Sequence, residues 1–168
     1  MGRTSLTRDF KEFLQCLNDH GVRFLVIGGH AVGFHGYPRA TADLDVWVDL
    51  NPKNAELLVQ ALVEFGFNVP ALRKEMFLPR DRIIRLGIAP NRIEILTGID
   101  GITFTEAYPN RIKAETEGVV VSYISLPDLK KNKKASGRSK DLNDLENLPE
   151  GSPTKSTNAP RRNKTRRG

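Results

Sequence analysis

The chain has 168 residues, which is enough for one domain with a single core, and 39% of them are hydrophobic. Its formal net charge is +6, but residues 149–168 carry +5 of it, with six Lys or Arg against Glu150 alone. The part before them is close to neutral, which argues against a strongly basic folded domain, and no apolar run approaches the ~20 residues of a membrane span.

The terminal segment 149–168 is predicted to be disordered, because it combines basic residues with Pro, Ser, Thr, Asn and Gly and has almost no apolar side chain to bury. We therefore divide the chain into one domain, 1–148, and a basic tail, 149–168. The tail either neutralises nucleic-acid phosphates or is a solvated end. The single cysteine, Cys16, excludes an internal disulfide, which fits a cytoplasmic protein.

The first half of the chain predicts alternating helices and strands. Residues 23–27 form a nearly continuous apolar run typical of a buried strand. Residues 43–50 alternate, as in a strand with one buried face. Asn51 and Pro52 provide an N-cap and a first-turn proline. The expected elements are a helix over 7–20, a strand over 23–27, a short helix over 30–35, a strand over 43–50 and a helix over 52–65.

The second half predicts more strands and ends in helices. Pro90-Asn91 lies between two short apolar runs, as in a hairpin. Thr103 and Ser125 are placed to cap helices. The expected elements are an irregular piece over 67–79, strands over 82–86, 92–96 and 119–124, a short helix to 107, a helix from 125 and a final helix over 139–148. The pattern predicts an α/β fold with about five strands under helices.

Acidic side chains form the sharpest feature of the sequence. Asp43 and Asp45 are two apart on a predicted strand, so both leave the same face. Carboxylates this close repel each other unless cations intervene, and Mg²⁺ prefers such hard oxygen ligands. Two Mg²⁺ ions can hold the attacking and the leaving oxygen of an in-line phosphoryl displacement. Glu94, between two isoleucines, becomes the third ligand if strand 92–96 lies beside strand 43–50.

Gly28 and Gly29 follow the first buried strand and precede a predicted helix. Glycines in this position allow a phosphate to approach the backbone and the free N–H groups of the helix start. Each feature also has a plain structural interpretation. The two aspartates could form a solvated sheet edge, the glycines could form only a tight turn, and Glu94 could pair with a nearby arginine. The candidate partners are Arg82, Arg85 and Arg92.

Other polar and aromatic side chains near these motifs have less specific interpretations. His30 follows the glycines and is expected to reach phosphate or solvent, whereas His35 is expected to pack or hydrogen-bond locally. Trp47 shares the face of the two aspartates, where it either stacks on a base or packs in the core. Three histidines and one cysteine do not provide a credible zinc set.

Ile27-Gly28-Gly29, followed after thirteen residues by Asp43-Leu44-Asp45, resembles the motif of the DNA polymerase β-like nucleotidyltransferase superfamily. Residues 28–45 are most similar to small prokaryotic members of the AbiEii-toxin-like or minimal-nucleotidyltransferase group. The resemblance implies a mixed sheet flanked by helices with a C-terminal helical segment. It also implies NTP and Mg²⁺ binding, with Asp43, Asp45 and Glu94 as metal ligands, although Asp is common where this chain has Glu94.

A second match covers Asn132 to Leu145, which is similar to the Lys-x-Ala-x-x-Arg-x-Lys-Asp-x-x-Asp segment of those proteins. This likeness assigns Lys133 and Arg138 to triphosphate contacts, although such a basic run is usually a solvated face. Asp141 and Asp144 are expected to orient these cations by ion pairing.

Two residues that come just before the aspartate pair, Arg39 and Thr41, are expected at phosphate or ribose, because phosphoryl transfer depends on positioning and charge stabilisation. An exposed loop is the alternative interpretation of this segment.

Together these features predict an enzyme that transfers an NMP from an NTP to a tRNA, a protein or a small-molecule acceptor. The group it resembles includes toxin–antitoxin proteins, so a toxin or antitoxin partner is a further expectation. Two alternatives stay open. One is an inactive family member that binds a nucleotide or a partner protein, and the other is an RNA-binding module that uses the basic tail.

Overall fold

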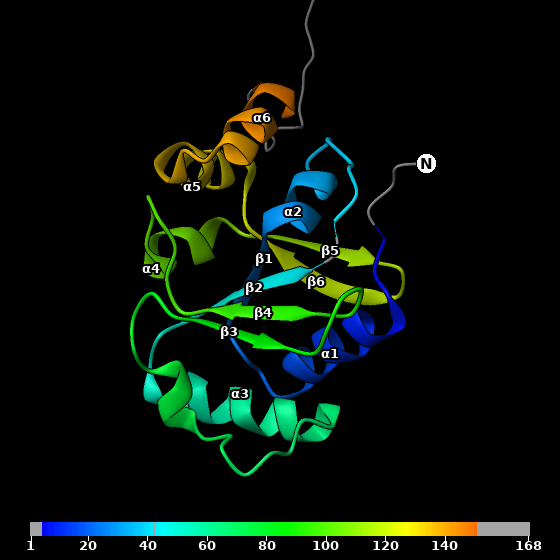
Figure 1. The fold of residues 1–168 in the computed structure, drawn as a ribbon, viewed down its shortest axis with the longest axis vertical. Coiled ribbons are helices and arrows are strands. Elements are labelled where there is room, and N and C mark those ends of the chain that lie inside the picture. Colours follow the sequence, from blue (N-terminus) through cyan, green and yellow to red (C-terminus); the bar gives the residue numbers. More distant parts are fainter. Residues whose placement is uncertain (1–4, 42, 151–168) are drawn as a thin grey trace, which may run out of the picture.

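A computed structural model describes residues 5–41 and 43–150 (Figure 1), so most of the predicted tail lies outside the described residues. Helices and strands alternate along the chain. In order they are α1 (Arg8–Asp19), β1 (Phe24–Ile27), α2 (Gly28–Phe34), β2 (Leu44–Val48), α3 (Pro52–Phe65), the 3₁₀ helix η1 (Lys74–Phe77), β3 (Ile83–Leu86), β4 (Ile93–Leu96), α4 (Phe104–Ala107), the 3₁₀ helix η2 (Tyr108–Asn110), β5 (Ile112–Thr116), β6 (Val119–Tyr123), α5 (Leu126–Ser136) and α6 (Ser139–Asn147).

The strands form one mixed sheet of six strands in the order β3-β4-β2-β1-β6-β5. The β2–β4 and β1–β6 pairs are parallel, and the other neighbours are antiparallel. The α/β fold with a mixed sheet and a C-terminal helical segment is confirmed. The sheet has one strand more than the sequence predicted.

The additional strand is β5, which pairs with β6 as an antiparallel hairpin at one edge of the sheet. The turn between them consists of Glu117 and Gly118, whose φ angles are 52° and 92°. Two consecutive residues with positive φ are typical of the tight turn that matches the twist of a hairpin. The strand was missed because its alternating side chains are half-buried at most, which leaves a weak apolar pattern.

Side-chain alternation gives the central strands two different faces. On one face, Leu44 and Val46 of β2 lie opposite Ile93 and Ile95 of β4, and all four are buried. Figure 1 shows α1 and α3 to one side of the strands, and α2 with the α5–α6 pair to the other. The polar residues of the same strands alternate with these apolar ones and therefore point to the opposite face.

Capping residues fix the ends of the helices around the sheet. The Asn51 side chain accepts a hydrogen bond from the Asn54 backbone at the start of α3, and Ser125 caps α5 in the same way. Gly137 ends α5 in a left-handed conformation, with a φ of 67°, and α6 begins two residues later. The prediction of two separate helices, one from 125 and one from 139, is confirmed, and the turn at Gly137 folds α6 back against α5.

None of the helices in residues 5–41 and 43–150 has both the length and the apolar character needed to cross a membrane.

Candidate functional site

A cleft of about 750 Å³ opens on the polar face of the sheet, between β2, β3 and β4 on one side and the C-terminal helices on the other. All nine residues predicted to form a site line this cleft. They are Gly28, Gly29, Arg39, Thr41, Asp43, Asp45, Glu94, Lys133 and Arg138. The structure therefore brings together segments that lie more than a hundred residues apart in the sequence.

The parallel pairing of β2 with β4 places Asp45 directly opposite Glu94. Residues opposite each other in a sheet point to the same face, so both side chains leave the apolar core together. Asp43 comes directly before β2 and also lines the cleft. The three carboxylates therefore converge on one side of the sheet, as the strand pattern predicted for their positions.

Asp45 is the carboxylate most affected by this convergence. Burial raises its pKa to about 7, and the negative charges of Glu94 and Asp43 act in the same direction. Its Oδ1 atom is buried without a hydrogen-bond partner among the described residues. A buried carboxylate oxygen with no partner is costly, so this atom favours a ligand that supplies positive charge.

The other two carboxylates are paired with arginines. Arg92 donates two hydrogen bonds to Asp43, at 3.2 and 3.1 Å, and Arg85 donates one to Glu94 at 2.8 Å. Arg85 is thus the partner of Glu94 among the three arginines considered from the sequence. Within the described part of the chain, no three acidic, histidine or cysteine side chains stand in a ready-made metal-binding arrangement.

Both glycines of the motif are required by close packing in the cleft. A Cβ atom on Gly28 would lie 2.1 Å from Oδ2 of Asp45, and one on Gly29 would lie 2.4 Å from Oγ1 of Thr41. Gly28 also has a φ of 69°, which side-chain-bearing residues rarely adopt. The glycines therefore leave room for the two polar side chains that face the cleft.

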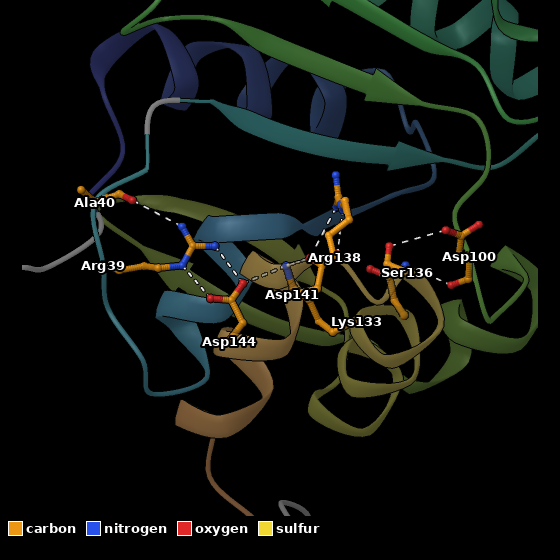
Figure 2. Close-up of polar contacts among 9 residues, drawn as sticks. Arg39, Ala40, Asp100, Lys133, Ser136, Arg138, Asp141 and Asp144 are labelled. Carbon is orange, nitrogen blue, oxygen red and sulfur yellow. Dashed lines mark hydrogen bonds and ion pairs between the residues drawn. The ribbon is translucent and has the colours of Figure 1, made fainter.

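A row of ion pairs forms the helical wall of the cleft (Figure 2). Asp144 accepts two hydrogen bonds from Arg39, both at 2.9 Å. The Lys133 ammonium lies 3.1 Å from Asp141 and 2.9 Å from Asp144, and Arg138 donates to Asp141 at 2.8 Å. The ion pairing expected for the two aspartates is therefore present.

The pKa values of both aspartates are lowered by this row. Burial alone would raise them, but the hydrogen bonds from Arg138 and Lys133 to Asp141, and from Arg39 and Lys133 to Asp144, outweigh it. Both side chains are buried, so their charge is retained only because the cations are adjacent.

The histidines and the tryptophan have structural surroundings. His30 is 5% exposed and packs edge-on against Phe10, so the expectation that it reaches phosphate or solvent is wrong. Burial lowers its pKa to about 4. His35 lies 2.7 Å from the Ile124 carbonyl oxygen, so it hydrogen-bonds within the fold, but to a residue distant in the sequence and not locally as expected. Trp47 is buried against Phe104 and belongs to the core.

Several charged side chains in the cleft were not singled out from the sequence. Asp81, Asp100 and Lys140 line it. The Lys140 charge acts to lower the pKa of Asp45. Arg85, one of the three candidate partners of Glu94, lies opposite it in the β3–β4 hairpin. No sequence pattern marks Asp81, which lies in a turn with a φ of 59°.

Comparison with known proteins identifies the fold. No family model and no curated protein matches the chain. Among solved structures, the chain is similar to a "putative nucleotidyltransferase" from Thermotoga maritima, with 16% identity, a TM-score of 0.54, and coverage of 84% of this chain and 94% of the other.

A second similar structure is an antigenic nucleotidyltransferase-like protein from Paracoccidioides brasiliensis, with 15% identity, a TM-score of 0.47, and coverage of 86% of this chain and 77% of that one. At 16% identity and a TM-score of 0.54, the first likeness establishes a shared fold alone. The TM-score of the second is too low to support a conclusion.

Proposed function

We propose that this protein is a Mg²⁺-dependent nucleotidyltransferase that transfers an NMP from an NTP to an acceptor. One observation carries the proposal. Asp43, Asp45 and Glu94 converge beside Gly28-Gly29 in a cleft of about 750 Å³. Because fold alone does not define activity, we infer the activity from this group of residues and not from the likeness to other structures.

The side chains present are chemically suited to Mg²⁺. All three are hard oxygen donors, and Asp45 has a buried oxygen without a partner among the described residues. In this proposal Asp43, Asp45 and Glu94 would hold two ions. Arg85 and Arg92 would then give up their present contacts with Glu94 and Asp43. When bound, the ions would neutralise phosphate charge and orient the reacting oxygens.

In the proposed reaction an acceptor hydroxyl oxygen forms a bond to the α-phosphorus of the NTP. The bond from that phosphorus to the oxygen bridging the α- and β-phosphates breaks, pyrophosphate leaves, and the hydroxyl proton passes to a site carboxylate or to solvent. The chain positions the reactants, which is the main protein contribution to such reactions. Gly28 and Gly29 admit the phosphates, while Arg39, Thr41 and Arg138 contact the triphosphate or ribose, with Lys133 in the same wall.

The acceptor belongs to one of three classes, namely tRNA, a protein side chain or a small molecule. The motif likeness to AbiEii-toxin-like proteins supports the first two classes and a place in a toxin–antitoxin pair. The ion-paired carboxylates support a second candidate, a protein that binds a nucleotide or a partner without transfer. In that case Arg85 and Arg92 would remain on Glu94 and Asp43 permanently.

Label transfer separates these functions. The protein is incubated with each α-labelled NTP, Mg²⁺, and either total tRNA or cell lysate. We expect label on one acceptor class, and a loss of at least about a hundredfold in the Asp45→Asn variant, because one charge of the carboxylate group is removed without a change in size. Asp49→Asn is the matched control, since Asp49 follows the same strand but pairs with Arg23 outside the cleft.

Two outcomes would contradict the enzyme. NTP binding without transfer to any acceptor would favour the binding protein, and equal transfer by Asp45→Asn and the unaltered chain would remove the proposed site.

A further inference from the structure

We propose that Lys133 is a positioning residue that does not contact the nucleotide. It holds Arg39 and Arg138 in place through Asp144 and Asp141, and the two arginines bind the triphosphate. This inference rests on the proposed function, which supplies the polyphosphate ligand, and it reassigns the role that the sequence motif suggested for Lys133.

The position of the Lys133 ammonium argues against direct contact. Its side chain is 5% exposed, and its nitrogen is within 3.1 Å of Asp141 and 2.9 Å of Asp144. These two aspartates are almost completely buried. Turning the ammonium toward a ligand would leave two adjacent buried carboxylates without their shared cation, which is strongly unfavourable. Lys133 therefore remains between the aspartates whether or not a ligand is bound.

Each aspartate also holds an arginine. Asp144 accepts both hydrogen bonds of the Arg39 fork, and Asp141 accepts from Arg138. The five side chains thus form a continuous row, Arg39–Asp144–Lys133–Asp141–Arg138, as Figure 2 shows. The row connects the loop between α2 and β2, which contains Arg39, to helix α5 and to α6 with its N-cap Arg138, which supply the other four side chains.

Among the three cations of the row, exposure is lowest at the centre and higher at both ends, while the side chains of the two aspartates between them are 1% exposed. The Lys133 side chain is 5% exposed, that of Arg39 is 22% exposed and that of Arg138 is 69% exposed. The row has three cations and two anions, so it keeps one positive charge at the cleft. The ends are accessible to a polyanion and the centre is not, which divides the row into contacting residues and a residue that orients them.

Orientation matters because a guanidinium binds phosphate through a planar fork of N–H groups. Here one edge of each guanidinium is held by an aspartate, which fixes the direction of its other N–H groups. Such an arginine loses less freedom when a ligand binds those groups, so preorganisation increases affinity. A competing explanation is that the row only clasps the C-terminal helices to the rest of the domain. In that case its residues would affect stability and not ligand affinity.

The sign of one charge change separates the two explanations. Asp144→Asn removes a negative charge near the site, which on charge alone would strengthen polyanion binding. The positioning role predicts the opposite. We expect the dissociation constant of ATP, measured by calorimetry with Ca²⁺ in place of Mg²⁺, to rise roughly tenfold, because a charge-assisted contact loses its alignment. Arg39→Gln should weaken binding to a similar extent.

The double variant Asp144→Asn/Arg39→Gln should bind no more than about twofold more weakly than Arg39→Gln alone, because residues that act in series are not additive. Asp141→Asn, which acts on Arg138, gives an independent series if Asp144→Asn does not fold. Asp128→Asn is the matched control. Asp128 is a buried carboxylate on α5 that bonds Asn110 and Lys131 away from the cleft, so its change should leave the affinity unaltered.

Tighter or unchanged ATP binding in Asp144→Asn, with the protein folded by thermal melting, would overturn the positioning role while leaving the proposed function intact. Fully additive effects of the Asp144 and Arg39 changes would do the same. If the unaltered protein bound no nucleotide at all, the proposed function would fail and this inference with it.

Discussion

Gly28 meets two separate demands at the scale of a single residue. Its backbone has a positive φ, and its missing side chain leaves the space that Asp45 occupies. Gly21 has the same φ of 69° but has open space around its Cα. The two glycines therefore form a matched pair, with the same backbone φ but with a close neighbour at the Cβ position of Gly28 alone.

We expect Gly21→Ala to lower the free energy of unfolding by about 1 kcal/mol, which is the usual penalty for a side chain in the left-handed region. Gly28→Ala should cost a further ~1–3 kcal/mol, because its Cβ overlaps Asp45. It should also abolish label transfer, which Gly21→Ala should preserve. Urea titration and the transfer assay measure the two effects. Equal losses of stability with activity retained in both variants would contradict this account of Gly28.

At the residue scale, the sequence correctly predicted side-chain positions wherever the alternation of side chains along a strand was sufficient. The spacing of Asp43 and Asp45, and the apolar neighbours of Glu94, fixed the face of each side chain once the strands were recognised. Which arginine pairs with Glu94 depended on the register of the β3–β4 hairpin. The burial of His30 could not be read from its neighbours, because the contact comes from Phe10 on a different helix.

At the scale of elements, Asn54 connects the ends of two strands to the start of α3. Its side chain accepts a hydrogen bond from the Arg23 backbone N–H at 2.8 Å. It also donates to the carbonyl oxygens of Arg23 and Asp49, at 3.1 and 3.0 Å. This buried amide therefore provides a partner for the Arg23 N–H and the Asp49 carbonyl, and a second donor for the Arg23 carbonyl, which also accepts from the Asp49 backbone.

Asn54→Ala should lower the free energy of unfolding by roughly 2–3 kcal/mol, since it removes three hydrogen bonds made by a buried amide. Chemical denaturation followed by circular dichroism measures this loss. Asn147→Ala is the control, because Asn147 is exposed near the end of α6 and its side chain donates to the Asn143 carbonyl, so its change should stay within about 0.5 kcal/mol. Losses of similar size in the two variants would show that Asn54 does not stabilise this junction.

Element prediction was most accurate where caps and apolar periodicity agreed. The N-cap Asn51, the first-turn proline and the closing Gly66 fixed both ends of α3. The strand β5 was not predicted, because a strand at the edge of a sheet pairs on one side only and buries few apolar side chains. The burial of Lys133 could not be predicted from the residues around it, because a basic run on a helix is normally solvated. Its ammonium is enclosed by aspartates of α6, which packs against α5.

At the scale of the whole molecule, charge is separated along the chain. Six of the 26 basic residues and none of the 20 acidic ones lie in 151–168, so residues 1–150 carry no net formal charge. The charge that would attract nucleic acid at long range therefore belongs to the segment after the domain, while the cleft contains both signs.

We expect a chain that ends at residue 150 to keep its denaturation midpoint and its affinity for ATP. It should lose most of its binding to a fluorescent single-stranded RNA at low salt, because this binding depends on neutralising phosphates. Anisotropy titrations of the full and shortened chains at several salt concentrations make the comparison. RNA binding with the same affinity and the same salt dependence in both chains would place the polyanion surface within residues 1–150.

The parallel register of β2 with β4 has a practical consequence. A cut in the connection between α3 and β3 would leave Asp43 and Asp45 on one fragment, and Glu94 with Lys133 and Arg138 on the other. Neither fragment would contain all three carboxylates. The set would be restored only when β2 of one fragment pairs with β4 of the other at the four positions of their register. The chain thus suits a split reporter, in which a bait and a prey fused to the halves would be detected by the label transfer proposed above.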